Sequence, residues 1–228
     1  MSVDWSNTAL VVFDLDGTLY DQRPIRMAMA RALIAASVQE RGMTTARILR
    51  IYRQLGENQP DPLPDDFGRW RIEETARLCT VNPAHVRDTV EDWMHRRPLP
   101  LLLRHRVAGV AELFDRLRAS GRRIAVWSDY PVRRKLAALG LAADLEVWAG
   151  QPVMPRPKPD AEGLREILRA IDAAPQDSLV IGDRFDRDWA AAQRLSIPAL
   201  MRSRKPDPRA PTFWRFTDPV FAPILAGQ

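Results

Sequence analysis

The sequence contains only one cysteine, Cys79, among its 228 residues. One cysteine cannot form an internal disulfide, and a thiolate metal site needs several. We therefore expect Cys79 to be a small apolar residue within a helix rather than a reactive thiol. The low cysteine content fits a reducing compartment, so the expected location is the cytoplasm.

Long apolar runs are also absent from the sequence. No run approaches the ~20 residues that a helix needs to cross a bilayer. The first ten residues contain no basic segment followed by an apolar one, which is the pattern of a secretory signal. We expect neither a membrane partner nor a leader peptide.

The charge is moderately basic, with 34 Lys and Arg against 29 Asp and Glu. The basic residues are nearly all arginine, and they are scattered along the chain. No basic stripe interleaved with aromatic residues is present, and such a stripe is typical of single-strand binding. We do not expect nucleic acid as a partner.

Short apolar runs alternate with helical patterns over most of the chain, which predicts an α/β fold with a parallel sheet. The expected strands cover residues 8–13, 123–127, 144–148, 178–181 and 198–201. The expected helices between them cover residues 107–120, 131–139, 160–171 and 186–195. The tail, residues 203–228, shows no pattern that assigns it.

One block of the sequence interrupts this alternation after the first strand. It predicts helices over residues 24–41, 44–55, 68–79 and 84–96, with a proline-rich loop at 58–66 and no strand. Asn82 followed by Pro83 is a typical start for the last of these helices. We therefore predict a Rossmann-like core formed by residues 1–20 and 105–228, and an inserted all-helical cap domain at residues 21–104.

Polar residues follow several of the expected strands, where an open parallel sheet binds its ligands. Asp14 and Asp16 lie two residues apart, so in an extended chain they point the same way. A carboxylate can attack phosphorus, and a second carboxyl group can protonate the leaving oxygen and later activate water. Asp-x-Asp-Gly alone is also a common acidic turn, so this pair needs support from other positions.

Four segments in order supply that support. They are Phe-Asp-Leu-Asp-Gly-Thr-Leu at 13–19, Val-Trp-Ser at 126–128, Arg-Pro-Lys-Pro-Asp at 156–160 and Ile-Gly-Asp-Arg-Phe-Asp-Arg-Asp at 181–188. Their sequence and spacing resemble the four motifs of the haloacid dehalogenase-like (HAD) hydrolase superfamily. The resemblance is to its phosphatase type, with a helical cap inserted after the first motif.

The resemblance implies a role for each motif residue. Asp14 would attack phosphorus and ligate Mg²⁺, and Asp16 would be the general acid/base with its backbone carbonyl on the metal. Lys158 would neutralise charge on Asp14 and on the phosphoryl oxygens. The remaining roles are Ser128 as a phosphoryl hydrogen-bond donor, Asp183 as a Mg²⁺ ligand and Asp188 as the residue that holds Lys158 or a metal-bound water.

The resemblance leaves the roles of two positions undecided. Asp186 competes with Asp188, because spacing in the fourth motif varies. Asp129 stands where family members often carry asparagine, and a carboxylate pointing at a phosphate is unfavourable. We expect Asp129 to turn outward or to cap the helix that starts at Pro131.

Asp16 also separates the activities of this superfamily. Its dehalogenases lack an aspartate there, so Asp16 favours phosphoryl transfer. A phosphonate hydrolase would need a cap lysine, and residues 21–104 contain none. The predicted function is Mg²⁺-dependent hydrolysis of a small phosphorylated metabolite, with Arg23 and Arg26 as candidate substrate contacts. A sugar phosphomutase and a nucleic-acid end phosphatase remain alternatives.

Overall fold

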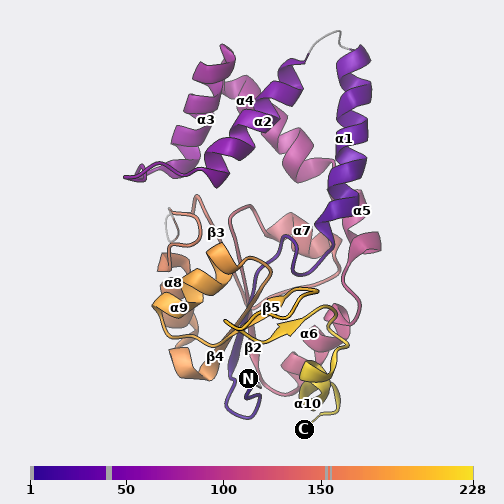
Figure 1. Cartoon of the computed structure of the whole chain (residues 1–228), viewed down its shortest axis with the longest axis vertical. Helices are drawn as coiled ribbons and strands as arrows, with labels where there is room; N and C mark the ends of the chain where they lie inside the picture. Colours follow the sequence, from indigo (N-terminus) through magenta and orange to yellow (C-terminus); the bar gives the residue numbers. More distant parts are fainter. Residues whose placement is uncertain (1–2, 40–42, 152–153, 155, 228) are drawn as a thin grey trace. The chain divides into compact units, whose positions relative to one another are not determined.

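A computed structural model describes residues 3–39, 43–151, 154 and 156–227. The chain forms two compact units, which we call the sheet unit (Met1–Asp21 and Leu103–Gln228) and the helical unit (Gln22–Leu102). Figure 1 follows the chain through both. Within the described ranges, no helix is long and apolar enough to cross a bilayer.

The sheet unit is built on six parallel strands in the order β3-β2-β1-β4-β5-β6. The central strand β1 (Leu10–Phe13) consists of four buried apolar residues, as expected for a strand covered on both faces. The chain adds β2 and β3 on one side of β1 and then crosses over to add β4, β5 and β6 on the other. This change of direction at β1 is the switch point where such sheets bind ligands.

The five predicted strands are all present, and the predicted α/β fold with a parallel sheet and a helical insertion is confirmed. Their observed ends differ from the predicted ones by one or two residues. The other strand bounds are β2 Arg123–Ser128, β3 Leu145–Trp148, β4 Ser178–Gly182, β5 Ala199–Arg202 and β6 Thr212–Phe213. The two-residue β6 was not predicted, since a strand that short has no periodicity to recognise.

Helices cover both faces of the sheet (Figure 1). Their bounds are α6 Val110–Ala119, α7 Arg133–Ala138, α8 Glu162–Ile171, α9 Ala190–Arg194 and α10 Ala222–Leu225. On one face, α8 packs against β2 and β3, and its buried Leu164 and Ile167 join a core with Val12 and Trp127. On the other, α6 contacts β2, and α10 packs against α6.

The tail that the sequence left unassigned completes the second face. Phe213, Phe216 and Phe221 are buried and lie within 5.3 Å of one another by ring centroids. Phe216 also contacts Phe13 of β1 edge-on at 6.1 Å. Aromatic residues bury large apolar areas, so this cluster ties the tail to the central strand.

The helical unit has its own core of residues such as Ile48, Tyr52, Cys79 and Val86. Its helices are α1 Gln22–Gln39, α2 Thr44–Glu57, α3 Phe67–Cys79, α4 Pro83–Val90 and α5 Leu99–Leu102. Its described residues contain no strand. Cys79 is buried, and burial raises the pKa of its thiol.

Asn82 caps α4 as predicted, because its side chain accepts a hydrogen bond from the Ala84 N–H at 2.8 Å. The predicted single helix over residues 84–96 is interrupted. After Val90 the chain continues as a wider π-type turn, Glu91–Arg96, in which the Arg97 N–H donates to the Asp92 carbonyl. Nothing in the local sequence pattern signals such a turn.

We expect Phe216→Ala to lower the free energy of unfolding by about 3–5 kcal/mol, because it leaves a cavity against β1. Leu103→Ala is the control, since that side chain is 57% exposed and its loss should cost little. Chemical denaturation of both variants measures the difference. A cost for Phe216→Ala as small as that of the control would contradict the packing of the tail.

Candidate active site

Three strands of the sheet end at the same edge. Phe13 at the end of β1 aligns with Val126 of β2 and with Ile181 of β4. The residues that follow, Asp14, Ser128 and Asp183, therefore lie at adjacent strand ends. Residue 158 reaches this edge from the loop that precedes α8.

Lys158 lies between two carboxylates at this edge. Its Nζ donates to Asp14 Oδ1 and to Asp188 Oδ1, both at 2.7 Å. The side chains of Lys158 and Asp188 are each 2% exposed, and that of Asp14 is 10% exposed. Removing one partner from a buried ion pair leaves an uncompensated charge, which is strongly destabilising. The three side chains must therefore be treated as one unit.

Burial and charge act on these groups in opposite directions. Burial raises the pKa of Asp14 well above its ordinary value, and the Lys158 ammonium opposes that rise. Burial alone would lower the pKa of Lys158, but the Asp14 and Asp188 carboxylates raise it above its ordinary value. The two carboxylates thus favour the charged form of Lys158.

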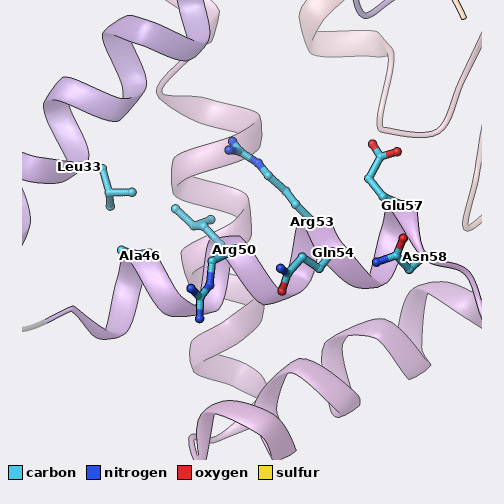
Figure 2. Close-up of a pocket in the computed structure, with 8 residues that line it drawn as sticks. Leu33, Ala46, Arg50, Arg53, Gln54, Glu57 and Asn58 are labelled. Carbon is cyan, nitrogen blue, oxygen red and sulfur yellow. The ribbon is translucent and has the colours of Figure 1, made fainter.

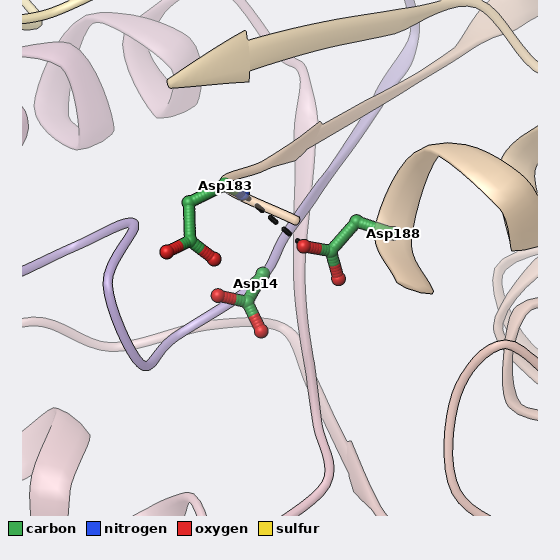
Figure 3. Close-up of side chains that lie close together, drawn as sticks. All are labelled: Asp14, Asp183 and Asp188. Carbon is green, nitrogen blue, oxygen red and sulfur yellow. Dashed lines mark hydrogen bonds between the residues drawn. The ribbon is translucent and has the colours of Figure 1, made fainter. Parts of the chain in front are cut away.

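A group of carboxylates beside Lys158 could hold a metal ion. Asp14, Asp183 and Asp188 each contribute one oxygen to a set whose members lie within 4.8 Å of one another. Figure 3 shows these three side chains close together. Burial, followed by the nearby Asp188 carboxylate, raises the pKa of Asp183 to about 7. Carboxylate oxygens are the ligands that hard divalent cations prefer. The three carboxylates supply such ligands, and a bound cation would relieve the repulsion between them.

The loop after β1 can lie this close only because residue 17 is glycine. Gly17 has a φ of +104°, and a Cβ there would lie within 3 Å of Asp183 carboxylate atoms. The Arg202 guanidinium fixes the same loop by donating to the Gly17 carbonyl and to Asp21, both at 2.6 Å. Any side chain at position 17 would displace Asp183.

The charge count at this edge is also unbalanced. Three cations, Lys135, Lys158 and Arg187, contact four of its carboxylates directly, and Asp183 is a fifth. Two negative charges are therefore not balanced by these contacts. A divalent cation would neutralise them, which agrees with the geometry of the acidic group.

Asp188, not Asp186, is the carboxylate that contacts Lys158. The chain makes a wider π-type turn over Phe185–Trp189, and the Arg184 carbonyl accepts hydrogen bonds from both Asp188 N–H and Trp189 N–H. Asp188 Oδ2 in turn accepts from the backbone N–H groups of Asp183 and Arg184. Asp186 instead forms an exposed ion pair with Arg184, whose hydrogen bond lowers the pKa of Asp186.

The second carboxylate of the first motif points to a different set of partners. Lys135 Nζ donates to Asp16 Oδ1 at 2.6 Å and to Oδ2 at 2.8 Å, and the Tyr20 hydroxyl donates to Oδ1. Ser128 Oγ lies 3.5 Å from Asp16 Oδ2. The two motif carboxylates are therefore held apart, Asp14 by Lys158 and the Thr18 hydroxyl, and Asp16 by Lys135.

The expectation for Asp129 was wrong. Its side chain does not turn outward and does not cap a helix, since α7 starts at Arg133 without a side-chain cap. Asp129 Oδ1 accepts the Lys158 N–H at 2.8 Å, and Oδ2 accepts from Arg187 Nη1 at 3.2 Å. Arg187 Nη1 also donates to the Lys158 carbonyl at 2.9 Å. The Asp129–Arg187 pair therefore fixes the Lys158 backbone from both sides.

Sequence reasoning missed four of these residues, namely Lys135, Tyr20, Arg187 and Arg202. One signal was available for the first. The chain contains only three lysines among 34 basic residues, and Lys135 and Lys158 are the two that are buried. The two arginines gave no such signal in a chain this rich in arginine.

The remaining candidates, Arg23 and Arg26, lie exposed on α1 in the helical unit. That unit also has a cavity of about 370 Å³ with a mixed lining, drawn in Figure 2. Among its described residues, the helical unit brings together no group of carboxylates comparable to that of the sheet unit. Its lining residues are Leu33, Ala46, Leu49, Arg50, Arg53, Gln54, Glu57 and Asn58.

The Asp129–Arg187 pair should show coupling in a double-mutant cycle of Asp129→Asn and Arg187→Met. We expect the two losses of unfolding free energy to be non-additive by about 0.5–3 kcal/mol, because removal of either side chain leaves the other buried without its opposite charge. The exposed pair Arg69–Glu73 is the control, and its cycle should be close to additive because solvent screens the pair. Additive losses at Asp129 and Arg187 would contradict the pairing.

Solved structures share this architecture. An HAD phosphatase from Thermococcus onnurineus superimposes with a TM-score of 0.67 at 18% identity, over 97% of this chain and 99% of that one. The HAD-hydrolase YfnB from Bacillus subtilis, solved bound to magnesium, gives a TM-score of 0.65 at 15% identity, over 91% and 95% of the two chains. At these identities the likeness concerns the fold.

Sequence comparison identifies curated relatives and a family. A phosphoglycolate phosphatase from Mesorhizobium japonicum is 28% identical over 199 residues, which cover 84% of this chain and 82% of that protein. The family model for haloacid dehalogenase-like hydrolases matches residues 8–195, which include all four motifs and the helical unit between β1 and β2. The chain therefore belongs to the haloacid dehalogenase-like hydrolases.

Proposed function

We propose that this hydrolase is a Mg²⁺-dependent phosphatase that cleaves a small phosphate monoester through an aspartyl-phosphate on Asp14. The observation that carries the proposal is the separate support of two neighbouring carboxylates. Asp14 contacts a buried ammonium on the side of the acidic group, and Asp16 contacts Ser128 and Lys135 on the other side. A nucleophile and an acid/base need this division of roles.

The first step forms the covalent intermediate. An Asp14 oxygen attacks phosphorus, the bond from phosphorus to the ester oxygen breaks, and the proton of the Asp16 carboxyl group moves to that oxygen to release the alcohol. Lys158 stabilises charge on Asp14 and on the transferring group, and Ser128 Oγ can donate to a phosphoryl oxygen. Such fixed electrostatic contacts provide most of the rate in phosphoryl transfer.

The second step returns the enzyme to its starting state. Asp16, now a carboxylate, takes a proton from water, whose oxygen attacks the phosphorus of the aspartyl-phosphate. The bond from phosphorus to Asp14 breaks, and inorganic phosphate leaves with the former water oxygen. The net reaction consumes one ester and one water and gives one alcohol and one phosphate.

Mg²⁺ would be held by Asp14, Asp183 and the backbone carbonyl of Asp16, and it would neutralise phosphoryl charge when bound. In this proposal Asp188 positions Lys158, since both of its oxygens already accept hydrogen bonds. The helical unit would supply contacts to the leaving group, with Arg23 and Arg26 as its candidates. The names of the curated relatives make 2-phosphoglycolate the first substrate to test.

Asp14→Asn should lower kcat for release of phosphate by about 10³-fold or more, because the amide cannot form the intermediate. Asp186→Asn is the matched control, since this carboxylate lies in the same motif region, is exposed and pairs with Arg184. Release of inorganic phosphate from 2-phosphoglycolate and from p-nitrophenyl phosphate measures both variants. Substantial turnover by Asp14→Asn would rule out this mechanism, and conversion without phosphate release would indicate a mutase.

Binding of Mg²⁺ should stabilise the protein more at high pH than at low pH. In the metal-free protein, burial raises the pKa of Asp183 from 3.8 to about 7. Between these two pKa values the folded state binds a proton that the unfolded chain has lost. The stability that this proton contributes is fully present below the unfolded pKa of 3.8 and is lost as the pH rises through the folded pKa of about 7. Mg²⁺ needs the carboxylate and removes this loss.

Thermal unfolding with and without Mg²⁺ at about pH 5 and about pH 8 tests this expectation. At a Mg²⁺ concentration of about 100 times Kd, binding raises the free energy of unfolding by about 2.7 kcal/mol, which corresponds to a Tm rise of about 5–10 °C. Asp183→Asn should lose this rise at about pH 8, whereas Asp186→Asn should keep it. An equal rise at both pH values, or in Asp183→Asn, would place the metal elsewhere.

A further inference from the structure

Lys135 makes a two-point contact with the Asp16 carboxylate. Its Nζ lies 2.6 Å from Oδ1 and 2.8 Å from Oδ2, and the two side chains are 9% and 13% exposed. The residue is the third of α7 and follows Ser128, the last residue of β2, by seven positions. Short, shielded contacts between charged groups are stronger than exposed ones and fix geometry more tightly.

Two further groups define the direction in which this carboxylate faces. The Tyr20 hydroxyl donates to Oδ1, and Ser128 Oγ lies 3.5 Å from Oδ2. Lys135 donates to both oxygens of the carboxylate, and Tyr20 donates to Oδ1 alone. Oδ2 is the oxygen turned toward the residue that would bind the phosphoryl group.

The use of lysine at this position is itself unusual for the chain. Only three of its 34 basic residues are lysine, and the third, Lys205, is exposed. A lysine presents a compact ammonium that fits between two oxygens and an aromatic ring, whereas an arginine presents a wider planar fork. Lys135 Nζ also lies 5.4 Å from the centre of the Tyr130 ring.

We propose that Lys135 is a positioning residue for Asp16, which orients Oδ2 toward the ester oxygen so that proton transfer to a poor leaving group is fast. This inference rests on the proposed function and adds to it a residue outside the four motifs. Lys135 acts through Asp16 and does not itself transfer the proton. Its effect is therefore confined to reactions in which the leaving oxygen must be protonated.

The dependence on leaving group provides the test. An alkoxide, as from 2-phosphoglycolate, needs a proton from Asp16, whereas p-nitrophenolate leaves without one. The ratio kcat/KM covers the steps up to formation of the aspartyl-phosphate, so it reports the acid step and not the later attack of water. Lys135→Met should lower kcat/KM about 10–100-fold for 2-phosphoglycolate and less than about 3-fold for p-nitrophenyl phosphate.

Two controls separate positioning from structural support. Lys205→Met removes the exposed lysine and should leave kcat/KM unchanged for both 2-phosphoglycolate and p-nitrophenyl phosphate. In the Asp16→Asn background, Lys135→Met should add no further loss with 2-phosphoglycolate, because the group it positions is gone. If Lys135→Met does not fold, Lys135→Gln, which also removes the charge, gives the same comparison.

The outcomes are distinct. A selective loss with 2-phosphoglycolate that disappears in the Asp16→Asn background supports the role of Lys135. Equal losses with both esters, no loss, or a full additional loss in the Asp16→Asn background overturns it. If the wild-type protein hydrolyses neither ester, the proposed function fails, and this inference fails with it.

Discussion

The rest of the site depends on one buried ammonium. Lys158 Nζ is enclosed in the sheet unit, and it remains charged because Asp14 and Asp188 lie 2.7 Å away. The ammonium in turn offsets the cost of burying those carboxylates, together with the Thr18 hydroxyl at Asp14 and two backbone N–H groups at Asp188. The surrounding elements serve this arrangement: β1 and the π-type turn bring in the carboxylates, and the Asp129–Arg187 pair fixes the lysine backbone.

The site thus contains two separate charge pairs with different chemical tasks. Lys158 supports the carboxylate proposed as nucleophile, and Lys135 supports the carboxylate proposed as acid/base. Because Lys135 comes from α7 and Lys158 from the loop before α8, neither carboxylate competes for the partner of the other. The carboxylates left over, chiefly Asp183, account for the affinity for a divalent cation that we propose.

Much of this could be predicted from the sequence, since the determining signals were local. The runs of apolar residues gave β1, β2, β4 and β5 within two residues, and the order of four short motifs predicted which side chains meet. The closeness of Asp14, Lys158 and Asp188 follows from parallel strands that end at one edge. Gly17 belongs to the first of these motifs, but the reason for a glycine there, the approach of Asp183, is a contact between distant segments.

The features that could not be predicted depend on contacts between distant segments. Asp186 and Asp188 both fit the variable spacing of the fourth motif. Only the wider turn after Arg184 decides which of them contacts Lys158. Asp129 was expected to avoid the site because Arg187, 58 residues away, had not been recognised as its partner. β6 and the buried tail have no periodic pattern, so their place against Phe13 came only from tertiary packing.

The most direct measurement of the central claim is to trap the covalent intermediate. The protein is mixed with Mg²⁺ and p-nitrophenyl phosphate, quenched with acid during turnover, digested and analysed by mass spectrometry. We expect one added phosphoryl group on the peptide that contains Asp14, and none on that peptide in Asp14→Asn. A phosphoryl group on another residue, or an unmodified Asp14 under conditions where a fast first step must leave the intermediate populated, would contradict nucleophilic attack by Asp14.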